Sequence, residues 1–165
     1  MAKHTIISLV LFVSVYTQLH AQVPKDSDLF RKLKYHDSVF FERSFNRCDI
    51  NYLENAIDKD LVFYHDKSGM QNREKFLANT KQYLCGDTLR KPIRKVEEAS
   101  LEVFPMYNNN VLYAAVQTGI HRFYIREKNK PDLLTGKAKF IHLYLLVNEQ
   151  WILKEVISFD HQSDD

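Results

Sequence analysis

The second half of the chain constrains the fold most, because it consists of strand-like segments separated by short polar connections. These segments are rich in β-branched and aromatic residues and cover 99–107, 111–126, 137–147 and 151–160. The turn at Asn108–Asn110 carries residues that tolerate positive φ. Further connections are expected at 129–135 and at 148–150. Consecutive strands joined by short turns pair antiparallel, so this half predicts a mostly antiparallel sheet.

Helical periodicity marks the preceding part of the chain. An amphipathic helix is predicted over 28–47, where apolar or aromatic side chains recur every three or four residues at Leu29, Leu33, His36 and Phe40. Asp49 and Asn72 are suitable N-caps for two further helices, with a strand at 61–65 between them. The basic segment Lys91–Lys95 is interpreted as a solvated connection. This order predicts an α+β fold in which three N-terminal helices pack on one face of a strongly curved, mostly antiparallel β-sheet.

The first 21 residues have the features of a secretory signal. Lys3 gives a positive start, Thr5–Tyr16 is an apolar run, and Thr17–Ala21 is polar and ends in a small residue. The run is shorter than the ~20 residues that span a bilayer. The alternatives are a buried helix or an uncleaved anchor. We expect cleavage after Ala21, which leaves residues 22–165 as a single exported domain, periplasmic or secreted.

Two cysteines, Cys48 and Cys85, remain in the exported part of the chain. An oxidising compartment permits one intramolecular disulfide between them. In the chain-entropy model, a disulfide that closes this loop would raise the free energy of unfolding by roughly 4 kcal/mol. Neither cysteine lies in a CxxC motif, which argues against a metal site. Two free thiols are the alternative.

The charge balance argues against nucleic-acid binding. Lys plus Arg number 23 and Asp plus Glu number 21, so the formal net charge is only +2. A protein held to nucleic acid by its electrostatic field would carry a clear basic excess. No membrane contact is expected once the signal has been removed.

The order of elements and several local strings resemble the nuclear transport factor 2-like superfamily, which includes ketosteroid isomerase, scytalone dehydratase and SnoaL-type polyketide cyclases. The strings that carry the likeness are Asn46–Ile50, Asp60–Gly69, Asn72–Glu74, Gln117–Phe123, Lys139–Leu143 and Trp151–His161. Within the superfamily, the chain resembles an uncharacterised exported bacterial branch. The resemblance implies a cone-like fold around a pocket, and a homodimer.

The resemblance also allows a comparison with the catalytic groups of ketosteroid isomerase. The general base of that enzyme stands just after the first strand, at the place of Asp66. Its oxyanion-donating Tyr falls at about Phe41, which has no donor, and its acidic partner falls near Ile141, beside His142. Two of the three parts are missing, so steroid isomerisation is not expected.

A different set of polar side chains surrounds the expected pocket. The catalytic candidates are Asp66, His142 and Asp160, and the ligand-binding candidates are Tyr64, His65, His121, Arg122, Tyr124 and His161. Imidazole and carboxylate groups can act as an acid–base pair or bind a divalent metal, or they can be strand histidines that only stabilise the sheet. Neighbouring strand residues point to opposite faces, so His65 and Asp66, or Asp160 and His161, cannot both face inward on a regular strand. No metal or cofactor is predicted.

Three functions remain open from the sequence. The first is an exported small-molecule-binding or accessory domain, with a pocket lined by aromatics and histidines and a small apolar or carboxylate-bearing ligand. The second is a cofactor-free dehydratase, isomerase or cyclase that uses an Asp–His pair. The third is a structural or interaction domain.

Overall fold

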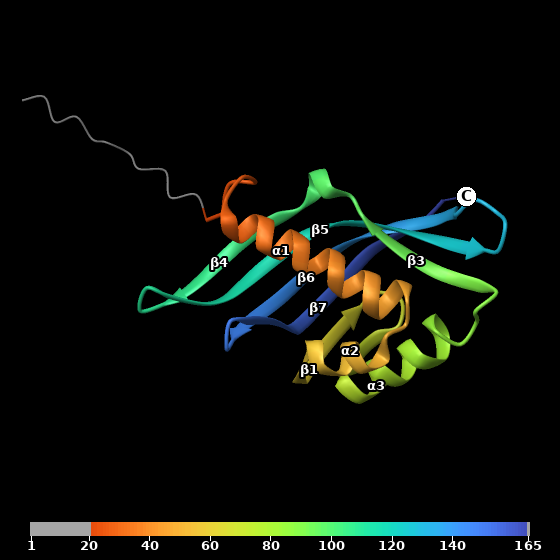
Figure 1. Ribbon diagram of the computed structural model, residues 1–165, viewed down its shortest axis with the longest axis horizontal. Helices are drawn as coiled ribbons and strands as arrows, with labels where there is room; N and C mark the ends of the chain where they lie inside the picture. Colours follow the sequence, from red (N-terminus) through yellow and green to blue (C-terminus); the bar gives the residue numbers. More distant parts are fainter. Residues whose placement is uncertain (1–20, 165) are drawn as a thin grey trace, which may run out of the picture.

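The computed structural model describes residues 21–164 (Figure 1). The apolar run of the predicted signal lies outside these residues, so cleavage after Ala21 stays a prediction. Between residues 21 and 164, no helix combines the length and apolar character that crossing a bilayer requires.

Three α-helices precede most of the sheet, as expected: α1 (Asp28–Phe41), α2 (Ile50–Ala56) and α3 (Arg73–Asn79). The side chains of Ser27, Asp49 and Asn72 cap them by accepting backbone N–H groups. The first and third helices continue into short π-helical turns, η1 (Glu42–Asn46) and η2 (Thr80–Leu84). The predicted helices are therefore confirmed, and two of them change their winding in the last turn.

The sheet has seven strands: β1 (Ile57–His65), β2 (Gly69–Asn72), β3 (Arg90–Val96), β4 (Glu102–Asn108), β5 (Val111–Glu127), β6 (Leu133–Val147) and β7 (Gln150–Ser163). Their order is β2-β1-β7-β6-β5-β3, and β4 also pairs with β5. The pair β1–β7 is parallel and the other pairs are antiparallel. The predicted α+β class and mostly antiparallel pairing are confirmed, whereas the strong curvature stays a prediction.

The long strand β5 organises one side of the sheet. Its first part pairs with β4 and its second part pairs with β3, and a single 3-10 turn, η3 (Glu98–Ser100), joins these two partners. Asn109 and Asn110 adopt positive φ in the β4–β5 turn, as do Asn148 and Glu149 in the β6–β7 turn. The turns predicted at these asparagines are thus confirmed.

Two strands were not predicted. The segment Lys91–Lys95, interpreted as a solvated connection, belongs to β3 and pairs with β5. Its Ile93 and Arg94 are buried. Charged residues and Pro92 conceal the strand pattern, although proline is tolerated on a strand at the edge of a sheet. The other unpredicted strand, β2, begins at Gly69, directly after a turn at residues 66–68. Strand β6 begins at Leu133, inside the segment expected to be a connection.

The core lies between the helices and one face of the sheet (Figure 1). From α1, Phe30, Leu33 and Phe40 are buried in it. The sheet contributes Phe140 and Tyr144 on alternate positions of β6. This packing fixes the positions of the strands that carry the histidines.

The predicted disulfide is present between Cys48 and Cys85, with an S–S distance of 2.01 Å. Cys48 follows η1 and Cys85 directly follows η2. The bond therefore ties the end of the first helical segment to the end of the third, on the side of the molecule where these segments approach β3.

Candidate functional site

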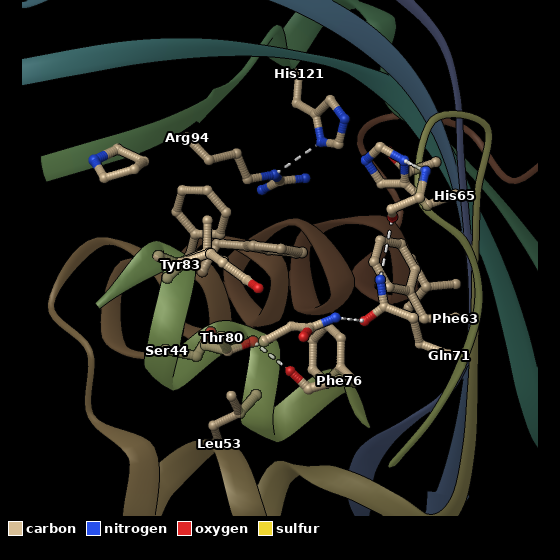
Figure 2. A pocket seen from close by; sticks show the side chains of 18 of the residues that line it. Ser44, Leu53, Phe63, His65, Gln71, Phe76, Thr80, Tyr83, Arg94 and His121 are labelled. Atoms are coloured by element: carbon tan, nitrogen blue, oxygen red, sulfur yellow. Dashed lines mark hydrogen bonds between the residues drawn. The ribbon is translucent and has the colours of Figure 1, made fainter. Parts of the chain in front are cut away.

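A cavity of about 530 Å³ lies between the helical segments and the sheet (Figure 2). Its volume is within the range of small-molecule sites. Most of its lining is aromatic or aliphatic, from Phe40, Phe41, Phe45, Phe63 and Phe76 among others. The polar lining groups include four histidines and one arginine, namely His65, His121, His142, His161 and Arg94.

The four histidines come from four neighbouring strands. His65 ends β1, His121 lies on β5, and His142 lies on β6. His161, on β7, reaches the cavity through a bulge: Phe159 pairs with Lys139, but Gln162 already pairs with Lys137. The additional residue allows Ser158 and His161 to line the same cavity three positions apart.

Asp160 is the residue that the bulge turns outward. Its φ is +58°, and its carboxylate lies 3.0 Å from Lys139 Nζ. Asp160 and His161 thus face different sides, as strand alternation predicts for neighbours. The structure places Asp160 outside the cavity, so the catalytic role predicted for it has no geometric support from its position.

Arg94, which lines the cavity, belongs to a buried ion pair. Arg94 Nη1 and Nη2 donate to the two carboxylate oxygens of Asp37 at 2.8 and 3.1 Å. Both side chains are almost fully buried. Arg94 also donates from Nε to His121 Nδ1 at 3.1 Å, a contact visible in Figure 2. Charged side chains are buried only when they are paired in this way.

Neither member of this pair was predicted. Asp37 lies four residues after Leu33 and three before Phe40, inside the buried stripe of α1. A carboxylate at such a position requires a buried cation. That signal was readable in the sequence, but its partner Arg94 lies in a segment mistaken for a connection, and nothing local pointed to it.

His121 lines the cavity and carries an unpaired proton donor. Because its Nδ1 accepts from Arg94, its Nε2 carries the proton of the neutral ring. This Nε2 is buried and has no hydrogen-bond partner among the described residues. Burial, followed by the charge of Arg94, lowers the pKa of His121 to about 2, so the ring is neutral.

His142 is held deeper, between two aromatic rings. It stacks on Phe41 and Phe140 with centroid distances of 5.3 and 4.3 Å. Its Nδ1 lies 3.4 Å from Tyr144 Oη and 3.7 Å from a carboxylate oxygen of Asp37. Burial and the nearby positive charge of Arg94 hold the pKa of His142 well below its ordinary value. This neutral ring forms part of the cavity wall.

At the other end of the cavity, His161 connects two groups. Its Nδ1 lies 2.5 Å from Asp66 Oδ1, and its backbone N–H donates to Asp66 Oδ2 at 3.1 Å. Its Nε2 lies 3.3 Å from the hydroxyl oxygen of Ser158. Since the carboxylate can only accept, Nδ1 carries a proton, and in the neutral ring Nε2 is then the acceptor. Partial desolvation acts to raise the pKa of Asp66, but the hydrogen bonds from His161 outweigh it and hold that pKa below its ordinary value.

His65 stacks on His161, with ring centroids 4.3 Å apart. Its Nδ1 accepts the backbone N–H groups of Lys67 and Ser68 at 3.1 and 3.2 Å, so its proton is on Nε2. Burial, and next the neighbouring His161, lower the pKa of His65. His65 is therefore a neutral donor, like His121.

The ligand atoms of His65, Asp66 and His161 lie within 4.8 Å of one another, as they would around a metal ion. However, Nδ1 of His65 faces two backbone N–H groups, and Nδ1 of His161 is protonated towards Asp66. A metal needs free lone pairs directed at one point. The geometry thus favours a hydrogen-bonded group over a metal centre.

The remaining ligand-binding candidates lie outside the cavity lining. Arg122 donates to Glu97 at 2.5 Å, and Lys95 Nζ lies 4.5 Å from the centre of the Tyr124 ring. Tyr64 is 43% exposed. These three residues alternate along their strands with side chains that do line the cavity. Because side chains alternate along a strand, the predicted ligand-binding residues are divided between the two faces of the sheet.

No family model and no curated protein matches the chain. Several solved structures resemble it in fold. Aln2 from a Streptomyces species matches with a TM-score of 0.64 at 7% identity, covering 79% of this chain and 89% of that one. A nuclear transport factor 2-like superfamily protein from Salmonella enterica matches with a TM-score of 0.59 at 16% identity, covering 78% and 89%.

A third similar structure is a nuclear transport factor 2-like protein from Cytophaga hutchinsonii, with a TM-score of 0.55 at 12% identity over 78% of this chain and 95% of that one. Identities this low establish a shared fold and leave function open. The chain therefore has the fold of the nuclear transport factor 2-like superfamily, as the motifs in its sequence predicted.

Proposed function

We propose that this protein is an exported small-molecule-binding or accessory domain whose ligand combines an apolar body with a hydrogen-bond acceptor, such as a carboxylate or carbonyl oxygen. The observation that carries the proposal is the unpaired, buried Nε2–H of His121, a residue that lines a cavity rich in aromatic side chains. A buried donor without a partner costs about 1–3 kcal/mol. A ligand oxygen would satisfy this donor.

The charges around the cavity leave a hydrogen-bond donor as the group that a ligand oxygen would meet. Asp37 neutralises Arg94, and burial keeps His121 and His142 uncharged. The cavity thus offers a hydrogen-bond donor rather than a free positive charge. The aromatic lining would contact the apolar body of the ligand.

Two observations support export. The N-terminal residues have the pattern of a cleaved signal. The protein also contains the Cys48–Cys85 disulfide, and disulfides form and persist in oxidising compartments outside the cytosol.

Calorimetric titration with 2-naphthoate tests the binding proposal. We expect one site per chain, with 2-naphthoate bound roughly 5- to 100-fold more weakly by His121→Phe, because this change removes the donor but keeps an aromatic ring. The matched control is Tyr107→Phe, an exposed position on β4 that should leave the affinity unchanged.

A second ligand separates loss of the donor from a general collapse of the cavity. Binding of 2-methylnaphthalene, which has no acceptor, should be the same in the wild type and in His121→Phe. No binding of 2-naphthoate by the wild type, or equal binding by wild type and His121→Phe, would contradict the proposal.

The contact between Asp66 and His161 favours a second candidate, a cofactor-free enzyme of the isomerase, dehydratase or cyclase type. In this case the base would be Nε2 of His161, oriented by Asp66, and the donors would be His65 and His121. Proton exchange at the α-carbons of 2-tetralone in D2O, followed by NMR, tests this reading. It predicts faster exchange with the wild type than with His161→Gln, and equal rates would count against it.

A further inference from the structure

Ser158, His161 and Asp66 form a continuous chain of contacts at the edge of the cavity. Asp66 Oδ1 lies 2.5 Å from His161 Nδ1, and His161 Nε2 lies 3.3 Å from Ser158 Oγ. We propose that these residues make Ser158 a nucleophile for acyl transfer, so that the protein hydrolyses small carboxylic esters bound in the cavity. The inference rests on the proposed function, because it requires that the cavity accept a ligand.

The contacts among Asp66, His161 and Ser158 indicate the protonation states that activation of the serine requires. The carboxylate of Asp66 accepts from both the ring and the backbone N–H of His161, and its pKa is lowered by these bonds, so it stays ionised at neutral pH. It holds the proton on Nδ1 and leaves Nε2 as a base facing the hydroxyl. A serine is a weak nucleophile unless an adjacent base takes its proton, and here the base is oriented by a third group.

The backbone is built to hold this arrangement. The positive φ of Asp160 creates the bulge that brings His161 to the same side as Ser158. The backbone N–H of Asp66 donates to the carbonyl of Ser158 at 3.2 Å, which joins the end of β1 to β7 at this point. A non-glycine residue in this conformation costs free energy, and such residues concentrate at functional sites.

Ser158 is accessible from the cavity and from little else. It lines the cavity and is only 5% exposed. His65 pairs with Ser158 across the parallel β1–β7 ladder and lines the same space. A substrate carbonyl would therefore reach Ser158 from inside the aromatic cavity, where an apolar acyl group is also accommodated.

The reaction balances without a cofactor. Ser158 Oγ attacks the ester carbonyl carbon while His161 Nε2 takes the hydroxyl proton, and the Nε2–H group of the neutral His65 or His121 ring stabilises the oxyanion. The carbon–oxygen bond to the alcohol then breaks, and the alcohol leaves with the proton from His161. Water attacks the acyl–serine ester and passes its proton to His161. The carboxylic acid leaves as Ser158 Oγ regains that proton.

Hydrolysis of p-nitrophenyl butyrate by the mature, disulfide-bonded protein tests the inference. We expect the release of nitrophenolate to fall roughly 10²- to 10⁴-fold in Ser158→Ala and in His161→Gln. Ser163→Ala, an exposed serine on the same strand, is the matched control and should keep the wild-type rate. Diisopropyl fluorophosphate should label Ser158, as found by peptide mass mapping.

Asp66 is a positioning residue, and its variants separate positioning from folding. Asp66→Asn should lose the hydrolysis, and Asp66→Glu should recover part of it, because only a carboxylate holds the proton on Nδ1 of His161. The thermal unfolding of both variants, compared with that of the wild type, accounts for any loss of folded protein.

The outcomes distinguish this inference from the binding proposal. The inference is supported if the Ser158→Ala variant binds 2-naphthoate like the wild type but does not hydrolyse the ester. A wild type that binds 2-naphthoate but neither hydrolyses the ester nor reacts with the fluorophosphate overturns the inference and leaves the binding proposal standing. A Ser158→Ala variant as active as the wild type also overturns the inference. A wild type that neither binds nor hydrolyses overturns both.

Discussion

At the scale of single residues, the buried pair of Asp37 and Arg94 decides the chemistry of the cavity. It places a full positive and a full negative charge where neither meets water, and it orients the ring of His121. Replacing a buried ion pair by apolar side chains is often nearly neutral for stability, whereas removing one partner is strongly destabilising. The pair therefore makes a sharp prediction about the free energy of unfolding.

Arg94→Met should reduce that free energy by about 3–5 kcal/mol, because it leaves the carboxylate of Asp37 buried without a cation. The double variant Asp37→Leu/Arg94→Met should recover most of the loss. Urea denaturation measures both. A double variant as unstable as Arg94→Met would show that packing, rather than an unpaired charge, accounts for the effect.

The buried histidines predict how stability depends on pH. The pKa values of His121 and His142 are lowered in the folded protein, where they face Arg94, Asp37 and each other, and lie near 6.5 in the unfolded chain. Below pH 6.5 the unfolded state therefore binds more protons than the folded state. Stability is fully present above this pH and falls as the pH is lowered, by about 1.4 kcal/mol per pH unit for each ring.

Urea denaturation between pH 7.5 and 5 would measure how the free energy of unfolding changes with pH. His142→Phe should make this dependence less steep by the contribution of one ring, about 1.4 kcal/mol per pH unit. Phenylalanine suits the position because His142 stacks between two phenylalanine rings. An unchanged slope in His142→Phe would mean that His142 is protonated in the folded state.

At the scale of elements, the bulge in β7 decides which side chains reach the cavity. A regular strand would turn His161 to the opposite face from Ser158, since the two are an odd number of residues apart. The bulge reverses that parity. Sequence alternation alone could separate Asp160 from His161, but it could not say which of them faces inward.

Substitutions at Asp160 test the importance of this bulge. Asp160→Gly should leave stability unchanged or raise it slightly, because glycine adopts positive φ without strain and the exposed contact with Lys139 contributes little. Asp160→Val should destabilise the fold by about 1–2 kcal/mol and weaken 2-naphthoate binding. Thermal unfolding and calorimetry measure the two effects, and equal behaviour of the variants would show that the bulge does not depend on this residue.

At the scale of the whole molecule, two predictions concern its location and assembly. The exported protein should begin at Gln22 or Val23, which N-terminal sequencing would show, and retention of Met1 would contradict signal cleavage. The homodimer implied by the superfamily resemblance stays a prediction, and light scattering on the mature chain would give its mass.

Local signals were sufficient for much of the fold. The helix caps at Asp49 and Asn72, the asparagine turns, and the helical and strand periodicities each depend on residues within a few positions of one another, so the sequence alone predicted three helices and most of the sheet. With only two cysteines in the sequence, one disulfide pairing was available, and it is present.

Tertiary structure decided the rest, because the deciding contacts join distant segments. The pairing of β3 with β5 buries an arginine in a segment whose composition indicates a surface loop. Asp37 meets Arg94, and Asp66 meets His161, only after the sheet has formed. The sequence determined which elements form, whereas the pairing of strands and one bulge determined which side chains share the cavity, since these depend on register rather than on local preference.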